Sequence, residues 1–317
     1  MKKKLYEQLK KIRLFRDMVS WIRWHSRKIK LGTENSDKVF YVIRRHDMHA
    51  GLFSFVMSNL GAVVEAEQKG YIPVIDMMNS ANSMLEQDEV GKKNAWDDYF
   101  EQPEGVTLDE IGKSKNVILG SIHPPKKYPG FSMILNPEEL TGWQRYASKY
   151  LKLNQAHVKA IQEYHDRYFA DKRVLGVLCR GTDYVAMKPY HHPVQPDPKE
   201  VVRKCREIMK EQKCECIYLA TEDQKIWDLF QGEFHGIVYS YQKTHYQSEN
   251  AEYIDRLGNS LLKPYERNAE YLVSIGILAR CNCLVAGATN GSYGALLLTT
   301  GYEYQYIYQL GRYEKSK

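Results

Sequence analysis

Short runs of apolar residues alternate with longer amphipathic stretches along most of the chain. Runs rich in Val, Ile and Leu are typical of buried strands in parallel sheets, whereas apolar residues repeated every three or four positions predict helices. This alternation predicts an α/β fold. The predicted strands lie within residues 39–44, 72–76, 116–120, 174–184, 216–223, 237–241 and 282–292. The predicted helices cover residues 52–69, 137–170, 201–212, 224–230, 265–280 and 291–298.

Polar residues follow three of the predicted strands at the point where each apolar run ends. The run VLGVLC ends at Arg180, Gly181, Thr182 and Asp183. Because ligands of α/β sheets bind outside the carboxyl ends of the strands, a guanidinium at Arg180 is well placed for a phosphate. The alternative is an ion pair between Arg180 and Asp183 that only ties the loop together. The other two strands are followed by Thr221, Glu222 and Asp223, and by Thr289, Asn290, Gly291 and Ser292.

These three segments resemble the motifs of a fucosyltransferase superfamily that contains core, nodulation and protein O-fucosyltransferases. The first motif reads Arg180-Gly181-Thr182-Asp183 with His192-Pro193 further on, and the second reads Ala220-Thr221-Glu222-Asp223. The third is a Leu284-Val285 strand followed by the turn Thr289-Asn290-Gly291-Ser292. Two positions depart from the family, since Leu178 stands where the family has histidine and Lys188 where core fucosyltransferases carry their catalytic glutamate.

The resemblance implies the GT-B architecture, in which two Rossmann-like domains face a cleft. A basic amphipathic helix is expected at residues 1–34, an acceptor-side domain at 35–150 and a donor-binding domain at 151–317. The implied activity is inverting, metal-independent transfer of fucose from GDP-fucose to a glycan. No metal or other cofactor is expected. The expected donor-binding residues are Arg180, Asp183, Thr221, Glu222, Asp223, Glu270, Thr289, Asn290, Gly291 and Ser292.

Candidate catalytic residues come from both halves of the chain. Arg180 is expected to neutralise the departing diphosphate, where charge accumulates in the transition state. The polar turn at residues 45–51 follows a predicted strand, and Asp47 is the expected general base, with His46 as the alternative. The same turn can equally be an ordinary helix cap with solvated charges. Lys188 is a poor base because its ammonium is protonated at neutral pH.

The amino-terminal thirty residues are strongly basic. They hold eleven Lys and Arg against Glu7 and Asp17, a net charge of +9, whereas the whole chain carries +6. Apolar residues at helical spacing predict a basic amphipathic helix. Such a helix can lie on an anionic membrane surface or pack on the protein with its lysines in solvent. No nucleic-acid-binding motif follows, so nucleic acid is not an expected partner.

Length and composition indicate a globular protein. The 317 residues are 43% hydrophobic and 26% charged, which suits two domains of ordinary size. No stretch approaches the ~20 apolar residues of a membrane span, and no signal-peptide core is evident, so a cytoplasmic protein at most peripheral to the inner face of the membrane is expected. The six cysteines are expected to be buried free thiols.

Two alternatives to fucosyl transfer stay open. Leu178 and Lys188 are compatible with a non-catalytic protein that binds a nucleotide sugar. The same fold can also take a different nucleotide-sugar donor, because the contacts that select the base are not visible in the sequence. The expected acceptor is a glycan or lipid-linked oligosaccharide of surface or capsular polysaccharide synthesis, and its identity and linkage cannot be read from the residues.

Overall fold

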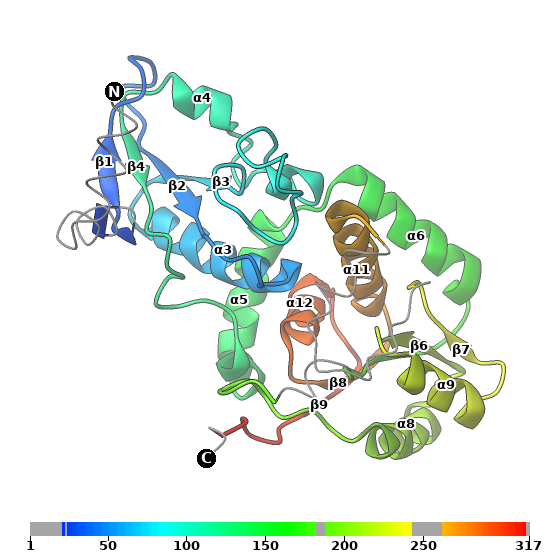
Figure 1. Cartoon of the computed structure of the whole chain (residues 1–317). Coiled ribbons are helices and arrows are strands. Elements are labelled where there is room, and N and C mark those ends of the chain that lie inside the picture. The colour runs from blue at the N-terminus through cyan, green and yellow to red at the C-terminus, as the bar shows by residue number, and fades with distance from the viewer. Residues whose placement is uncertain (1–20, 23, 182–187, 243–261, 315–317) are drawn as a thin grey trace.

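The computed structural model describes residues 21–22, 24–181, 188–242 and 262–314. Its amino-terminal half contains a four-stranded sheet of β1 (Arg27–Ile29), β4 (Val117–Leu119), β2 (Phe40–Arg44) and β3 (Ile72–Asp76), in that order. The last three strands are parallel, as predicted, and β1 is antiparallel to β4. Helix α3 (Leu52–Gln68) runs along one face of this sheet (Figure 1).

Strand β1 corrects part of the predicted amino-terminal helix. Arg27–Ile29 pairs with β4 at the edge of the sheet and is not helical. The sequence favours a strand here because the apolar Ile29 and Leu31 alternate with Lys28 and Lys30. Basic residues are also common on edge strands. Residues 1–20, which carry most of the predicted helix, lie outside the described residues.

The carboxyl-terminal half contains a five-stranded parallel sheet. Its order is β7 (Val238–Tyr239), β6 (Cys216–Ala220), β5 (Val174–Leu178), β8 (Cys283–Gly287) and β9 (Tyr304–Tyr308). The chain starts at the central β5, moves outward through β6 and β7, and then returns to β8 on the other side. The strand order therefore reverses between β5 and β8, which is where doubly wound sheets bind ligands. Strand β9 was not predicted.

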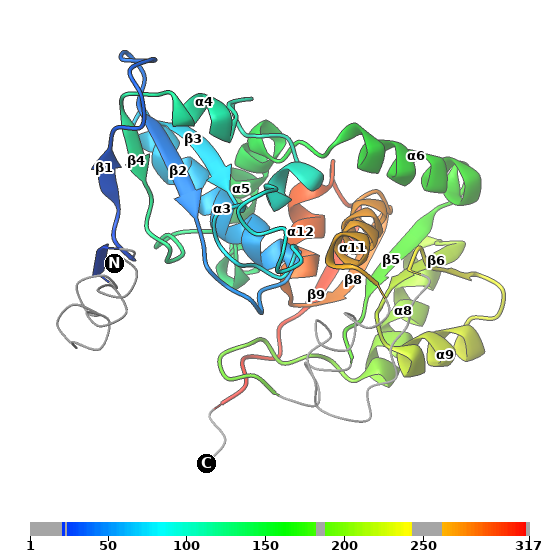
Figure 2. The same ribbon diagram turned by 45° about the horizontal axis from the view of Figure 1, so that its top comes forward.

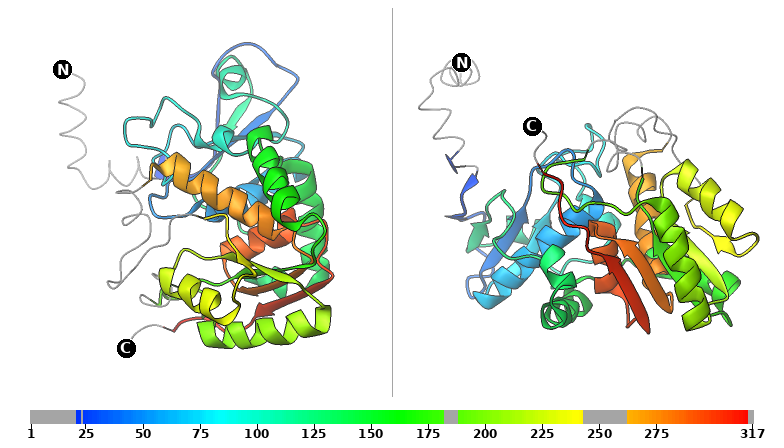
Figure 3. Two further views of the ribbon diagram at one scale, coloured as in Figure 1. Left: turned by 90° about the vertical axis from the view of Figure 1, so that its right-hand side faces the viewer. Right: turned by 90° about the horizontal axis from the view of Figure 1, so that it is seen from below.

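Helices cover both faces of the second sheet (Figure 3). Helices α8 (Pro198–Gln212) and α9 (Gln224–Glu233) lie on one face, and α6 (Gln155–Phe169) and α11 (Pro264–Leu278) lie on the other. The remaining helices of the described residues are α4 (Leu108–Gly112), α5 (Pro137–Tyr150), α12 (Asn290–Leu298) and the short 3-10 helices η1 (Ala95–Asp98) and η2 (Phe131–Ile134).

Helix α12 joins the two halves. It lies between α3 and α11 and also contacts α5 (Figure 2). A Cβ on Gly294 would stand 2.3 Å from ring atoms of Phe53, so glycine allows α3 to approach α12 closely. The side chain of Gln144 on α5 donates to the carbonyl of Leu296 at 2.8 Å. One hydrophobic core consequently contains residues of both sheets, from Ile75 of β3 to Tyr218 of β6.

The six cysteines are buried and free, as predicted. Burial raises the pKa of the Cys179 thiol, next to the Arg180 loop, well above its usual value. Cys179 is therefore protonated at neutral pH and is not a nucleophile. Among the described residues, no helix is long and apolar enough to cross a membrane.

Candidate functional site

The register of the second sheet brings two predicted site residues together. Leu178 at the end of β5 is paired with Ala220 at the end of β6. Two residues beyond this pair stand Arg180 and Glu222, and the Arg180 Nε lies 3.0 Å from a carboxylate oxygen of Glu222. Their side chains are only 17% and 11% exposed. Arg180 therefore pairs with Glu222 of the neighbouring strand end, within a largely buried setting.

The glycine after Arg180 is required by the packing of the next strand end. A Cβ on Gly181 would lie 2.2 Å from Oδ2 of Asp223, so only glycine lets the two loops approach this closely. Asp223 itself caps α9, and its Oδ1 accepts from the backbone N–H groups of Lys225 and Ile226 at 2.8 and 3.1 Å. Thr221 is buried and its hydroxyl accepts from the N–H of Asp223. Thr221 and Asp223 thus shape the loop, and Asp183 lies outside the described residues.

The third predicted segment forms the amino end of α12. The Thr289 hydroxyl accepts from the N–H of Ser292, and the Ser292 hydroxyl accepts in turn from the N–H of Thr289. The Ser292 hydroxyl is also 2.8 Å from the carbonyl oxygens of Gly287 and Thr289. Both hydroxyls are buried and form a capping box, so in this structure they hold the start of α12. The groups that α12 offers to an anion are its first backbone N–H groups, at Asn290 and Gly291.

Two residues from other elements hold the start of α12 in place. A Cβ on Gly291 would meet the Tyr271 hydroxyl at 2.2 Å and a Leu178 methyl at 3.1 Å. Leu178 is thus a buried packing residue between β5 and α12. The packing brings the Arg180 loop and the amino end of α12 to adjacent strand ends at the point where the strand order reverses.

Helix α11 contributes residues that the sequence did not single out. Tyr271 packs edge-on against Phe53 of α3, with ring centroids 5.6 Å apart. One turn earlier, Arg267 reaches across to the carbonyl of Ser83 at 3.4 Å. The predicted Glu270 is half-buried on another side of α11, close enough to Tyr241 to assist burial in raising the pKa of that phenol. Arg267 and Tyr271 are four residues apart and therefore lie on one side of the helix. This spacing is the sequence signal that could have identified them as a pair.

The turn at residues 45–51 is built around Arg45. One guanidinium nitrogen of Arg45 donates to the Ser54 carbonyl and to the Ser58 hydroxyl at 2.9 and 3.0 Å, and the other lies 2.7 Å from Asp47. The guanidinium also stands 4.7 Å from the ring centre of Phe55. Arg45 therefore fixes the turn to the first turns of α3.

Asp47, the expected base, is engaged by hydrogen bonds on both oxygens. Its Oδ1 accepts from the N–H groups of His49 and Ala50, each at 3.0 Å, and its Oδ2 from Arg45. Burial alone would raise the pKa of Asp47, but the bonds from His49, Arg45 and Ala50 outweigh it and hold the pKa below its ordinary value. A carboxylate with a lowered pKa is a weak proton acceptor. His46 in the same turn is exposed.

The same turn is connected to helix α11 through the loop after β3. Asp47 forms an isolated parallel bridge with Asn82, and the Ser83 hydroxyl donates to the Ala50 carbonyl at 2.5 Å. Ser83 is also the residue that Arg267 of α11 contacts. The turn of the first sheet is therefore connected through Ser83 to helix α11. Within residues 21–22, 24–181, 188–242 and 262–314, no group of three His, Cys, Asp or Glu residues could hold a metal ion.

The comparisons with known proteins concern the fold. No protein-family model matches the chain, and no curated protein sequence matches it. The crystal structure of the fucosyltransferase NodZ from Bradyrhizobium is similar, with 17% identity over 83% of this chain and 94% of that chain and a TM-score of 0.50. The apo crystal structure of POFUT1 matches with 10% identity over 87% of this chain and 99% of that chain, also with a TM-score of 0.50. The chain therefore has a fucosyltransferase-like fold.

Proposed function

We propose that this protein is a glycosyltransferase that moves fucose from GDP-fucose to a glycan acceptor with inversion at the anomeric carbon and without a metal. The observation that carries the proposal is that Arg180 and the amino end of α12 follow the adjacent parallel strands β5 and β8, where the strand order reverses. A guanidinium and a helix amino terminus are two complementary ways to bind a diphosphate. The motif resemblance and the fucosyltransferase-like fold support fucose as the transferred sugar.

The two sheets correspond, in this proposal, to the two domains of a GT-B transferase. Residues 35–150 form the acceptor side and residues 151–317 bind the donor, although α12 and α5 pack the two into a shared core. Arg180 and the first N–H groups of α12 stabilise the charge of the GDP leaving group as the glycosidic bond breaks. Because Glu222 already engages Arg180, it orients the guanidinium. Asp183 and Glu270 remain proposed donor contacts.

The proposed base is His46. The sequence predicts Asp47 as the base, but its lowered pKa and its three hydrogen bonds suit a residue that organises the turn. His46 stands next to it and is exposed. A mechanism in which the acceptor proton leaves late, without a protein base, is the alternative for this step.

The proposed setting is the cytoplasmic face of a membrane, with a lipid-linked oligosaccharide or other glycan of surface polysaccharide synthesis as the acceptor. Support comes from the basic amino-terminal sequence and from Trp21 and Trp24, which are 62% and 44% exposed beside the basic strand β1. Exposed Trp next to basic residues is typical of proteins that lie on anionic membranes.

Ligand-induced thermal stabilisation tests the donor. We expect GDP-fucose and GDP to stabilise the protein and UDP-sugars to have no effect, because a ligand at a hundred times its Kd stabilises by about 2.7 kcal/mol. Stabilisation by a UDP-sugar alone would identify a different donor. Binding of GDP-fucose without transfer to any acceptor and without hydrolysis would identify a non-catalytic binder.

The variant Arg180→Lys tests the role of the guanidinium. Lysine keeps the charge but loses the two-pronged contact, so we expect kcat to fall about 10²- to 10³-fold, as when one charge-stabilising donor is removed. Arg206→Lys, in an exposed ion pair on α8, is the matched control and should leave kcat unchanged. Near-normal turnover of Arg180→Lys would show that the Arg180 loop is structural.

A further inference from the structure

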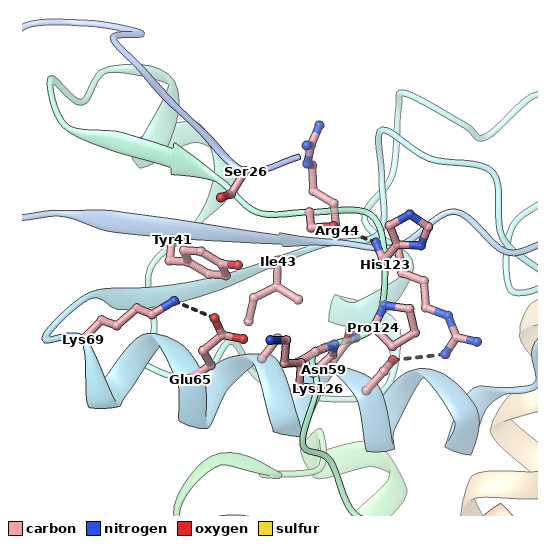
Figure 4. Close-up of a pocket in the computed structure, with 15 residues that line it drawn as sticks. Ser26, Tyr41, Ile43, Arg44, Asn59, Glu65, Lys69, His123, Pro124 and Lys126 are labelled. Atoms are coloured by element: carbon pink, nitrogen blue, oxygen red, sulfur yellow. Dashed lines mark hydrogen bonds and ion pairs between the residues drawn. The ribbon is translucent and has the colours of Figure 1, made fainter. Parts of the chain in front are cut away.

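A cavity of about 270 Å³ lies in the amino-terminal half of the protein (Figure 4). Its walls are β2, one side of α3 and the segment 121–126 that follows β4. A second cavity of about 230 Å³ shares Ser26, Tyr41 and Lys69 with the first and continues toward β1. None of the described donor residues lines either one. The two cavities together are called the α3 groove below.

The side chains of the groove combine hydrogen-bond donors and acceptors. Figure 4 shows Tyr41 from β2, Glu65 and Asn59 from α3 and Lys126 from the following loop around the cavity. The phenol and the amide can both donate and accept hydrogen bonds, the carboxylate accepts and the ammonium group donates. The apolar part of the wall is formed by Ile43, Ala62, Pro124 and Pro125.

The charges of the groove argue against a metal cation as the ligand. Glu65 forms an ion pair with Lys69 at 2.5 Å, so carboxylate and ammonium groups stand side by side in the wall. Arg27, Lys28, Arg44, Arg45, Lys69 and Lys126 outnumber the single carboxylate of Glu65 around the two cavities, so the lining repels a metal cation. A ligand that both donates and accepts hydrogen bonds, and has an apolar face, suits the phenol, the amide, the ion pair and the apolar wall at once. A pyranoside ring has these properties.

The groove is held open by rigid parts of the fold. A Cβ on Gly61 would lie 2.4 Å from the carbonyl oxygen of Lys127 and 2.6 Å from Tyr128, so the segment after β4 rests directly on α3. At the other end, the Ser121 hydroxyl donates to the Trp24 carbonyl at 2.5 Å. The cavity is smaller than the ~300–1,000 Å³ of typical drug-sized sites, which suits a single ring.

One guanidinium connects the groove to the candidate active-site turn. Arg45 lines the groove together with Ser58, to which it donates at 3.0 Å, and its other nitrogen is 2.7 Å from Asp47. A ligand in the groove would thus lie on one side of Arg45, with the turn at residues 45–51 on the other. An acceptor of more than one sugar could occupy both places.

We propose that the α3 groove binds a pyranoside ring of the acceptor, separate from the ring that receives fucose. The inference rests on the proposed glycan-directed function, and it names a second part of the acceptor site. Tyr41, Glu65 and Lys126 are its specificity residues. The groove selects acceptors longer than one sugar, because the reactive ring and the ring in the groove bind at different places.

Saturation-transfer NMR on methyl β-glucoside, methyl β-galactoside and methyl β-N-acetylglucosaminide tests the groove with GDP present to fill the donor site. We expect at least one glycoside to receive saturation from the wild-type protein, and this transfer to be lost in Glu65→Leu and in Lys126→Leu. Glu67→Leu is the matched control, because Glu67 lies on the same helix but pairs with Lys149 and does not line the groove.

The outcomes separate this proposal from the proposed function. Absence of saturation transfer to every glycoside, or its persistence in both groove variants, would overturn the groove as a sugar site. Thermal stabilisation by GDP, measured in the same samples, reports the donor site independently. If GDP fails to bind while the glycoside signal depends on Glu65 and Lys126, the groove stands and the proposed transferase function falls. Glu65 is 40% exposed and Lys126 is also exposed, so both leucine variants should fold.

Discussion

Arg180 and Glu222 form an ion pair across the ends of two adjacent strands, with 3.0 Å between Nε and the carboxylate. The pair has a direct consequence for donor binding, because the guanidinium that is proposed to meet the diphosphate already has an anionic partner. The pair is mostly buried, so loss of the carboxylate charge would remove part of the neutralisation of a largely desolvated guanidinium. A bound diphosphate would relieve that cost.

Glu222→Gln should therefore destabilise the free protein but strengthen the binding of GDP. In the absence of GDP we expect a loss of about 1.5–3 kcal/mol in the free energy of unfolding, the usual value of a hydrogen bond to a charged group. GDP should bind the variant more tightly than the wild type, which calorimetry measures. Weaker binding of GDP would instead show that Glu222 contacts the nucleotide itself. Glu200→Gln, on the exposed face of α8, serves as the control.

His46 and Asp47 are adjacent residues with different expected roles. His46→Gln should lower kcat about a hundredfold or more, the low end for removal of a general base, without changing GDP affinity. Asp47→Asn should lower kcat much less, because asparagine can still accept from the N–H groups of His49 and Ala50. Single-turnover rates with saturating GDP-fucose measure both. A large loss in Asp47→Asn with little in His46→Gln would restore Asp47 as the base.

Gly294 on α12 tests the contact between the two halves. Gly294→Ala places a methyl group 2.3 Å from the ring of Phe53, so we expect a loss of about 1–3 kcal/mol in the free energy of unfolding, as for other overpacked cores. Gly232→Ala on α9 meets nothing within 4 Å and should stabilise by about 0.5–1 kcal/mol. Urea unfolding measures both changes. Equal effects of the two alanines would show that Phe53 moves aside at no cost.

Much of the second sheet could be predicted because buried parallel strands appear as apolar runs that end abruptly in polar residues. β5, β6 and β8 were found in this way, and their in-register pairing places Arg180 beside Glu222. Strands β1 and β9 were missed for the opposite reason. Both lie at sheet edges, where residues such as Lys28 and Gln305 interrupt the apolar pattern.

The roles of the site residues were harder to predict, because they depend on packing between distant segments. The sequence of Thr289 and Ser292 is compatible with phosphate donors and with a capping box, and the capping box becomes visible only in the local geometry. Arg267 and Tyr271 were not predicted as site residues, because their contacts come from α3 and from the loop after β3, which are distant in the sequence. The GDP site itself stays a prediction.

Asp47 should also leave a signature in the pH dependence of stability. Hydrogen bonds hold its folded-state pKa below the unfolded value of about 3.9, so its contribution to stability is complete above that pH and is lost as the pH falls through the folded-state value. Asp47→Asn removes this titration. The difference in the free energy of unfolding between wild type and variant should thus be largest near neutral pH and shrink below about pH 4. Urea unfolding at several pH values measures it, with the exposed Asp171→Asn as control. A difference that stays constant down to acid pH would mean that the bonds from Arg45, His49 and Ala50 do not favour the ionised form, and Asp47 would again be a reasonable general base.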